Sequence, residues 1–233
     1  MQRVLVVEQI RLQKILDGEG FFEEPADVHG LLDIVRRHGE FVDRGEAEED
    51  HAWKQIVACA VIHTKSHILC LRRARNSNRA SLRLRHTVLL GGHADDFDRN
   101  SSDMLESCMR RELHEELGLK LDSPPRLLGV VSEPYTQVGS LHIGFVYDVE
   151  IRENVIQLSR ECDTAEFTMS GRPRTVELLP FHQIRPLSPS LDPWSKLFIA
   201  SHCFACLSPN PIHYGHDRQL EIPFADLPAR GVC

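Results

Sequence analysis

The sequence lacks the features that mark membrane-embedded and exported proteins. No run of about 18 apolar residues occurs in the 233 residues, which argues against a membrane-spanning helix. The first residues, MQRVLVVEQIRLQK, have neither the apolar core nor the cleavage site of a signal peptide. The seven cysteines are an odd number in such a chain, which favours reduced thiols over a disulfide framework. The sequence therefore predicts a soluble, cytoplasmic protein that does not bind membranes.

Positive charge is also in short supply. Lys and Arg number 27 against 34 Asp and Glu, which gives a formal net charge of -7. This balance argues against binding of nucleic acid over the whole surface and indicates that acidic residues should be sought in sites. The arginine-rich segment RRARNSNRASLRLRH leaves an RNA end open as a partner, although a solvated hairpin rim is the commoner explanation. A homodimer is left open.

The apolar periodicity divides the chain into three parts. Residues 1–50 contain two segments of helical period, VEQIRLQKIL and ADVHGLLDIVRRHG, which predict an N-terminal helical extension. Residues 51–190 hold short β-rich runs around one long helix, SDMLESCMRRELHEEL. Residues 191–233 hold a second helix, PWSKLFIASHCFACL, and a tail. This order predicts an α/β (α+β) fold, a sandwich of helices on a mixed central sheet, with one principal domain.

The long helix carries its own start and stop signals. Ser102 is the expected N-cap, with Asp103 in the first turn, and Gly118 lies just past the end as a left-handed cap requires. Leu113 and Leu117 form an apolar stripe along it. We therefore expect this helix to pack on the sheet through that stripe.

Three glutamates share one face of the same helix. Glu112, Glu115 and Glu116 are spaced at i, i+3 and i+4, and like charges so placed repel one another. A solvated acidic face is one explanation, and Arg111 beside them is an internal counter-charge. The other explanation is a site for Mg²⁺ or Mn²⁺, hard cations that prefer carboxylate oxygens and keep waters for a phosphate substrate.

These residues resemble the Nudix box, whose pattern is glycine, five residues, glutamate, seven residues, then R-E-apolar-x-E-E-x-G-apolar. The segment RELHEELGL matches the second half at every specified position. In the first half Gly92 is present, but Asp103 stands in for the glutamate, and eleven positions rather than six separate the two. The insertion DDFDRNSS is expected to enlarge the loop before the helix. Resemblance to one bacterial Nudix branch, labelled only as predicted phosphoesterases, spans roughly residues 30–202, including LGGH, VGSLHIGFVYDV and DPWSKLFIAS.

The resemblance implies a Nudix-type α/β/α sandwich and a hydrolase acting on phosphoanhydride bonds. Its substrate would be a nucleoside diphosphate linked to another moiety, cleaved to release a nucleoside monophosphate. The residues that it assigns to Mg²⁺ or Mn²⁺ are Gly92 (through its carbonyl), Glu112, Glu115 and Glu116. Arg111 would orient the glutamates. The catalytic base would be a box glutamate such as Glu115 or Glu116, or an acid of SRECDTAEF; of Glu161, Asp163 and Glu166, we choose Glu166.

Three further residues are candidates for substrate binding. Tyr135 lies sixteen residues after Leu119, where Nudix enzymes acting on dinucleoside polyphosphates often carry a base-stacking tyrosine, although a turn tyrosine after Pro134 is the commoner explanation. His93 and His142 are expected to approach the substrate, with His142 on the sheet face opposite Ile143 and its neighbours of the same parity. A buried histidine with satisfied hydrogen bonds is an equal alternative for both.

Three other classes of protein are alternatives to this interpretation: a zinc-binding protein, a nucleotide sensor and a prenyl-diphosphate isomerase. Four potential zinc ligands lie near the C-terminus, but their spacing differs from that of the usual finger and two cysteines fall within an apolar helix: Cys203, Cys206, His213 and His216. A nucleotide-sensing or interaction module without turnover is the alternative to an enzyme, favoured slightly by Asp103 and opposed by the three retained glutamates. A prenyl-diphosphate isomerase lacks a recognisable catalytic cysteine placement.

Overall fold

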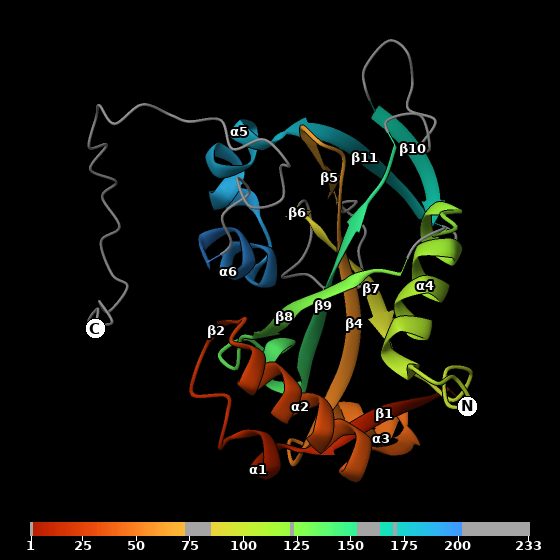
Figure 1. Ribbon diagram of the computed structural model, residues 1–233, viewed down its shortest axis with the longest axis vertical. Helices are drawn as coiled ribbons and strands as arrows, with labels where there is room; N and C mark the ends of the chain where they lie inside the picture. The colour runs from red at the N-terminus through yellow and green to blue at the C-terminus, as the bar shows by residue number, and fades with distance from the viewer. Residues whose placement is uncertain (1, 73–84, 122–123, 153–163, 170–171, 202–233) are drawn as a thin grey trace.

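The computed structural model describes residues 2–72, 85–121, 124–152, 164–169 and 172–201, with residues 164–169 and 172–175 described by their backbone alone. In this part of the chain, eleven strands form one mixed sheet (Figure 1). The strands are β1 (Arg3–Glu8), β2 (Gly20–Phe22), β3 (Glu40–Asp43), β4 (Trp53–His63), β5 (His67–Arg72), β6 (His86–Thr87), β7 (Leu89–His93), β8 (Arg126–Ser132), β9 (His142–Glu150), β10 (Thr164–Met169) and β11 (Arg172–Pro180). The helices are α1 (Gln9–Leu12), α2 (Pro25–His38), α3 (Arg44–Glu49), α4 (Met104–Leu117), α5 (Phe181–Ile184) and α6 (Pro193–Ser201), with short 3-10 turns η2 (Gly139–Leu141) and η3 (Arg185–Ser190).

Strand β4 is the centre of the sheet. It pairs in parallel with β9, from Gln55 opposite His142 to His63 opposite Glu150, and antiparallel with β1, β5 and β7. Every residue of β4 after Trp53 is buried, as a strand covered on both faces requires. The main path of the sheet runs β10-β11-β5-β4-β9-β8-β2.

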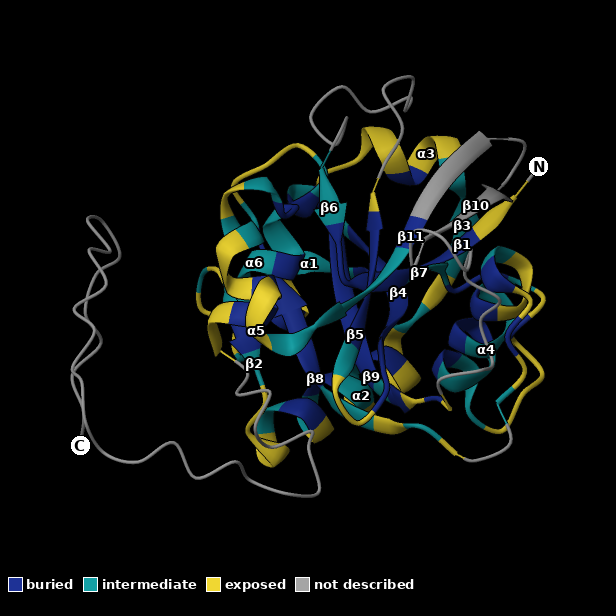
Figure 2. Ribbon diagram, turned by 90° about the horizontal axis from the view of Figure 1, so that it is seen from above, coloured by how far each residue is buried: buried dark blue, intermediate teal, exposed yellow. Residues whose placement is uncertain are grey.

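Helices cover the two faces of the sheet. On one face α4 packs Met109 and Leu113 into a cluster with Ile56 and Phe145, all fully buried. On the other face α6 packs Phe198 and Ile199 against residues of β4, β8 and β9. Figure 2 shows the buried residues gathered between these layers. The predicted α/β sandwich with a mixed central sheet is therefore confirmed.

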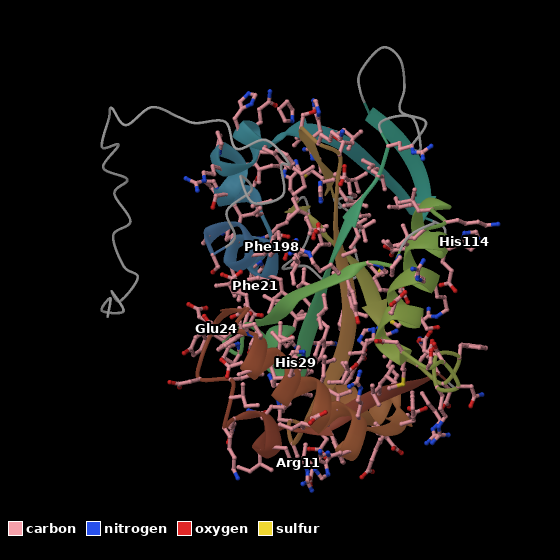
Figure 3. The ribbon with its side chains drawn as sticks, in the orientation of Figure 1. Arg11, Phe21, Glu24, His29, His114 and Phe198 are labelled. Atoms are coloured by element: carbon pink, nitrogen blue, oxygen red, sulfur yellow. The ribbon has the colours of Figure 1, made fainter. Side chains whose placement is uncertain are left out.

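The N-terminal segment also contributes strands, which the helical period of its sequence did not predict. Strand β1 pairs with both β3 and β4, and β2 extends the sheet beyond β8. Phe21 of β2 packs edge to face on Phe198 of α6, with ring centroids 5.1 Å apart (Figure 3). The expected helix VEQIRLQKIL is reduced to α1 because VLVVE, rich in β-branched residues, is used as a buried strand. The extension is therefore helical only in part, and its boundary at residue 50 stays a prediction.

The described helices include none that is long and apolar enough to cross a membrane.

A charged group is buried where β4 and β9 end. His63 is 2% exposed, and its Nε2 lies 2.7 Å from Asp148 Oδ1 while its Nδ1 lies 2.8 Å from the carbonyl of Thr64. Burial alone would lower the pKa of His63, but the hydrogen bonds to Asp148 and Thr64 raise it above its ordinary value. Arg126 holds the other oxygen of Asp148 at 2.9 Å. Since both ring nitrogens face acceptors, the imidazolium form fits this position best.

We expect the stabilisation from His63 to depend on pH. Because its folded pKa is raised, this contribution is fully present below the unfolded pKa of about 6.5 and is lost as the pH rises through the folded pKa. The difference in unfolding free energy between wild type and His63→Gln should therefore shrink as the pH rises from about 6 to 9. Urea denaturation across this range measures it. Arg126→Gln is the control, since its half-exposed ion pair should change stability by about 1 kcal/mol or less. A difference that grows with pH would contradict a charged His63.

Candidate functional site

The helix that carries the three glutamates has a defined cap at each end. Asp103, rather than the predicted Ser102, is the N-cap, and its side chain accepts the amide hydrogen of Glu106 at 3.0 Å. The prediction of Ser102 was wrong by one residue because it is the carboxylate of Asp103 that reaches the unpaired amide of the first turn. At the other end Gly118 adopts φ +67° and closes the helix on the carbonyls of His114 and Leu113, which confirms the predicted left-handed cap. His114 lies on the outer side of α4 (Figure 3).

Gly92 lies directly beneath the carboxylate of Glu112. A Cβ atom added at Gly92 would meet the three carboxylate atoms of Glu112 at 2.3–2.4 Å, so only glycine leaves this space. The carbonyl oxygen of Gly92 lies 3.6 Å from the Cys108 thiol, which donates to it from the same helix. Burial raises the pKa of Glu112, against the opposing effect of Arg111. The site therefore places a carboxylate with a disfavoured negative charge beside a backbone carbonyl.

Arg111 joins the helix to the loop before it. Its Nη1 donates to Glu112 Oε1 at 2.7 Å and lies 3.5 Å from Glu115 Oε2. Its Nη2 and Nε contact the two oxygens of Asp98 at 2.9 and 3.3 Å, and Nη2 also donates to the carbonyl of His93 at 3.1 Å. Burial would lower the pKa of Arg111, but Asp98 and its other acidic neighbours raise it overall. Arg111 thus contacts two of the three glutamates, Glu112 and Glu115, and its orienting role stays a prediction.

Asp98, which the sequence analysis passed over, is the main partner of Arg111. It is 1% exposed and follows Gly92 by six positions, which is the spacing that the Nudix pattern gives to its glutamate. The extra residues therefore lie after this acid and not before it: twelve rather than seven separate Asp98 from Arg111. The assignment of Asp103 to the glutamate position is corrected on this geometry, since Asp103 caps the helix instead. The signal for Asp98 in the sequence is its position after Gly92, from which five residues separate it as in the Nudix pattern.

The loop between β7 and α4 is fastened to the N-terminal strands. The amide of Leu5 donates to the carbonyl of Ala94 at 2.8 Å, and Arg3 pairs with Asp96 at 3.5 Å. Arg99 lies over the ring of Phe41, 5.0 Å from its centroid. These contacts hold the loop, and with it Asp98, in one place relative to the sheet.

His93 and His142 lie against each other on the sheet face opposite α4. Their Nε2 atoms are 3.0 Å apart, and His142 Nδ1 donates to the carbonyl of Val138 at 2.5 Å. Since Gly92 faces α4, the next residue, His93, faces the other way, and Gly144 two residues beyond His142 faces Trp194 of α6. His142 is 3% exposed. The structure thus brings the two histidines together but on the other side of the sheet from Glu112.

The remaining candidates are spread around these elements. Tyr135 is 75% exposed in the connection from β8 to β9. Glu166 belongs to β10, a strand that contacts α4, but its side chain is not described. Glu161 and Asp163 lie outside the described residues, as do the four possible zinc ligands at positions 203, 206, 213 and 216. Where side chains are described, no three carboxylate, imidazole or thiol groups converge closely enough to hold one cation as they stand.

Comparisons with known proteins agree with this architecture. Protein YmaB of Bacillus subtilis is 24% identical to this chain over 141 residues, which are 59% of this chain and 68% of YmaB. The crystal structure of Tm1382, assigned to the Nudix hydrolases, matches with a TM-score of 0.67 and 22% identity, over 85% of this chain and 96% of Tm1382. The likeness to Tm1382 shows that the fold is shared.

The mixed sheet between helices, with an acidic helix packed over Gly92 of strand β7, defines a Nudix-type sandwich. The model of the NUDIX domain matches residues 53–200, more than half of the chain. The chain therefore belongs to the Nudix family, and it is a hydrolase that acts on phosphoanhydride bonds.

A methyl group at Gly92 is expected to damage the site without unfolding the protein. In Gly92→Ala the Cβ would displace the Glu112 carboxylate, and a misplacement of about 1 Å can cost on the order of 100-fold in rate. Gly118→Ala is the matched control: nothing lies within 4 Å of its added Cβ, but its φ of +67° disfavours alanine. We expect the control to lose about 1 kcal/mol of stability and to keep its activity. Equal activity losses in the two variants would contradict the role given to Gly92.

Proposed function

We propose that the chain is a metal-dependent pyrophosphohydrolase that cleaves a nucleoside diphosphate linked to another moiety. Water would attack one phosphorus of the diphosphate, the bridging P–O bond would break, and a nucleoside monophosphate and a phosphorylated partner would leave. The observation that carries this proposal is the cluster of Glu112 over Gly92, braced by Arg111 and Asp98. It is a buried, charged arrangement on the helix that bears the family motif.

The residues of this cluster suit a Mg²⁺ or Mn²⁺ ion. Glu112, Glu115 and Glu116 supply carboxylate oxygens from one helix face, and Gly92 supplies a carbonyl beside Glu112. The raised pKa of Glu112 fits a carboxylate that needs a cation to hold its charge. Glu112 and Glu115 each turn one oxygen to Arg111, so cation binding requires these side chains to rotate toward a common point. When bound, such an ion neutralises phosphate charge and lowers the pKa of bound water.

The chain's own residues would position the reacting groups. Arg111 holds Glu112 and restrains Glu115, whose side chain is 58% exposed and therefore reachable by substrate. A carboxylate must also take the proton of the attacking water, and Glu115, Glu116 and Glu166 are the candidates. Strand β10 contacts α4, and Figure 1 shows one end of the strand at one end of the helix, which keeps Glu166 among them.

Substrate binding would involve residues outside the acidic cluster, namely Tyr135, His93 and His142. The exposed ring of Tyr135 is suited to stack on a nucleobase, an interaction worth about 1–3 kcal/mol in other nucleotide complexes. His142 donates through Nδ1 to the carbonyl of Val138, so its Nε2 accepts the Nε2 hydrogen of His93, and this bond would fix the His93 ring for contact with the ligand. The cytoplasmic location, the homodimer and an RNA end as partner remain predictions.

A screen over four substrates tests this function. ADP-ribose, UDP-glucose, diadenosine tetraphosphate and a dinucleotide RNA cap would be incubated with Mg²⁺ or Mn²⁺ and an excess of alkaline phosphatase, which attacks the terminal phosphates of the products. We expect phosphate release from at least one compound. Parallel reactions without alkaline phosphatase, separated by chromatography, should contain a nucleoside monophosphate that does not form in EDTA. The alternative, a nucleotide sensor, predicts binding with the ligand recovered intact after hours. A nucleoside monophosphate that still forms in EDTA, in reactions without alkaline phosphatase, would contradict the metal requirement.

A further inference from the structure

The connection between β8 and β9, residues 133–141, is held by a buried carboxylate at its start. Glu133 is 4% exposed, and its Oε1 accepts the amide hydrogens of Tyr135 at 3.0 Å and Thr136 at 3.1 Å. Its Oε2 accepts the hydroxyl hydrogen of Thr136. The same hydroxyl oxygen accepts the amide hydrogen of Gly139 at 3.0 Å, so the carboxylate organises Tyr135, Thr136 and, through Thr136, Gly139.

A buried lysine holds the other end of this connection. Lys54 of β4 is 4% exposed, and its Nζ donates to the carbonyl oxygens of Gly139 at 2.9 Å and Ser140 at 2.6 Å. These are the last carbonyls before Leu141 and the strand that begins at His142. Lys54 and Glu133 thus fix opposite ends of a segment that is far from either β4 or α4 in sequence.

The backbone of this segment is tightly packed at Gly139. A Cβ added at Gly139 would lie 1.6 Å from the carbonyl oxygen of Glu133 and 2.5 Å from its Oε2. The backbone of Gly139 therefore packs directly against both the backbone carbonyl and the carboxylate of Glu133. In contrast, the ring of Tyr135 between the two anchors is exposed, and its hydroxyl would lie 3.9 Å from a Cβ atom added at Gly18.

We propose that Lys54 and Glu133 are positioning residues for substrate binding, which hold segment 133–141 so that Tyr135 is presented to the nucleobase and His142 is fixed through Val138. This inference rests on the proposed function, because it takes the ligand to be a nucleotide that stacks on Tyr135. Holding the segment in its bound conformation before the ligand arrives removes an ordering cost from binding.

The charges of the two residues are costly to bury, which favours a role beyond filling the core. Burial lowers the pKa of Lys54 to about 8, although the negative charge of Glu133 opposes this shift. A methionine at position 54 would fill the same volume without that cost. Lysine, unlike methionine, can hold two carbonyl groups in a defined direction.

A double-mutant cycle with Tyr135 tests the proposal. The dissociation constant for the tightest of AMP, GMP, CMP and UMP would be measured by calorimetry, beside KM and kcat for the best substrate of the screen. We expect Glu133→Gln and Lys54→Met each to raise the dissociation constant and KM about tenfold while kcat changes about threefold or less. In the Tyr135→Ala background, the same substitutions should raise the dissociation constant and KM by less than about threefold.

Three comparisons keep the result decisive. Asp148→Asn, which breaks a buried ion pair elsewhere in the sheet, is the control and should lower the melting temperature without changing the dissociation constant. If Glu133→Gln or Lys54→Met does not fold, Thr136→Val takes its place in the cycle, since it removes only the hydroxyl links to Glu133 and Gly139. Equal effects with and without Tyr135, or no effect on binding, would overturn the proposal. No binding of any monophosphate by the wild type would overturn it too, whereas binding without hydrolysis would remove only the proposed catalytic function.

Discussion

Replacing Glu116 or Glu115 with glutamine is expected to lower kcat by about two orders of magnitude or more. Glutamine keeps the size of the side chain but removes a negative charge from the acidic face of α4, where a divalent cation would be bound. Steady-state rates with the best substrate of the screen measure the effect. The melting temperature should hold steady or rise, because repulsion between neighbouring carboxylates is relieved.

The control for this prediction lies on the same helix. Glu106 is also a helix glutamate, but it pairs with Arg110 at 2.8 Å and not with the Arg111 cluster. Glu106→Gln should therefore keep kcat within about threefold of the wild type, with a stability change of about 0.5 kcal/mol. Unchanged activity in both Glu115→Gln and Glu116→Gln would refute the metal site on this helix.

The second large effect is expected at Asp98. Removing its charge in Asp98→Asn leaves the half-buried guanidinium of Arg111 without its main partner, which should cost about 2–4 kcal/mol of unfolding free energy. Because Arg111 also holds Glu112, the rate should fall by at least about tenfold. Urea denaturation and initial rates measure the two effects separately.

Asp103 provides the comparison, since the sequence pattern alone gave it the role that the structure gives to Asp98. Asp103→Ala removes the N-cap of α4 and should cost about 1 kcal/mol of stability, with an activity loss far smaller than that of Glu116→Gln. A larger activity loss in Asp103→Ala than in Asp98→Asn would restore Asp103 as the acid of the motif.

Local patterns predicted the parts of this fold that depend on neighbouring residues. The period of Leu113 and Leu117 placed one face of α4 in the core, and Gly118 marked its end. The alternation around His142 placed its ring on the face opposite Ile143. In each case the deciding residues lie within one helix or strand, so their spacing along the sequence is enough to predict their placement.

Interactions between distant segments were not predictable in the same way. The helical period of residues 1–50 hid β1, because a strand buried between two partners needs only a short apolar run, which a helix can also use. The pairing of Arg111 with Asp98 depends on how the intervening residues fold. Lys54 and Glu133 are 79 positions apart, and nothing near either in the sequence marks them as anchors of one turn.

The attachment of the N-terminal strand to the motif loop bears on where the protein can be cut. A chain begun at Trp53, where the family match begins, would lose β1 and leave backbone groups of β4 unpaired at an open sheet edge, the kind of edge that promotes aggregation. It would also lose Arg3 and the amide of Leu5, which tether the loop that carries Asp98. The smallest piece able to fold reversibly and still hydrolyse substrate should therefore begin before Arg3, and deletions at this end should reach the active site through a loop more than ninety residues away in sequence.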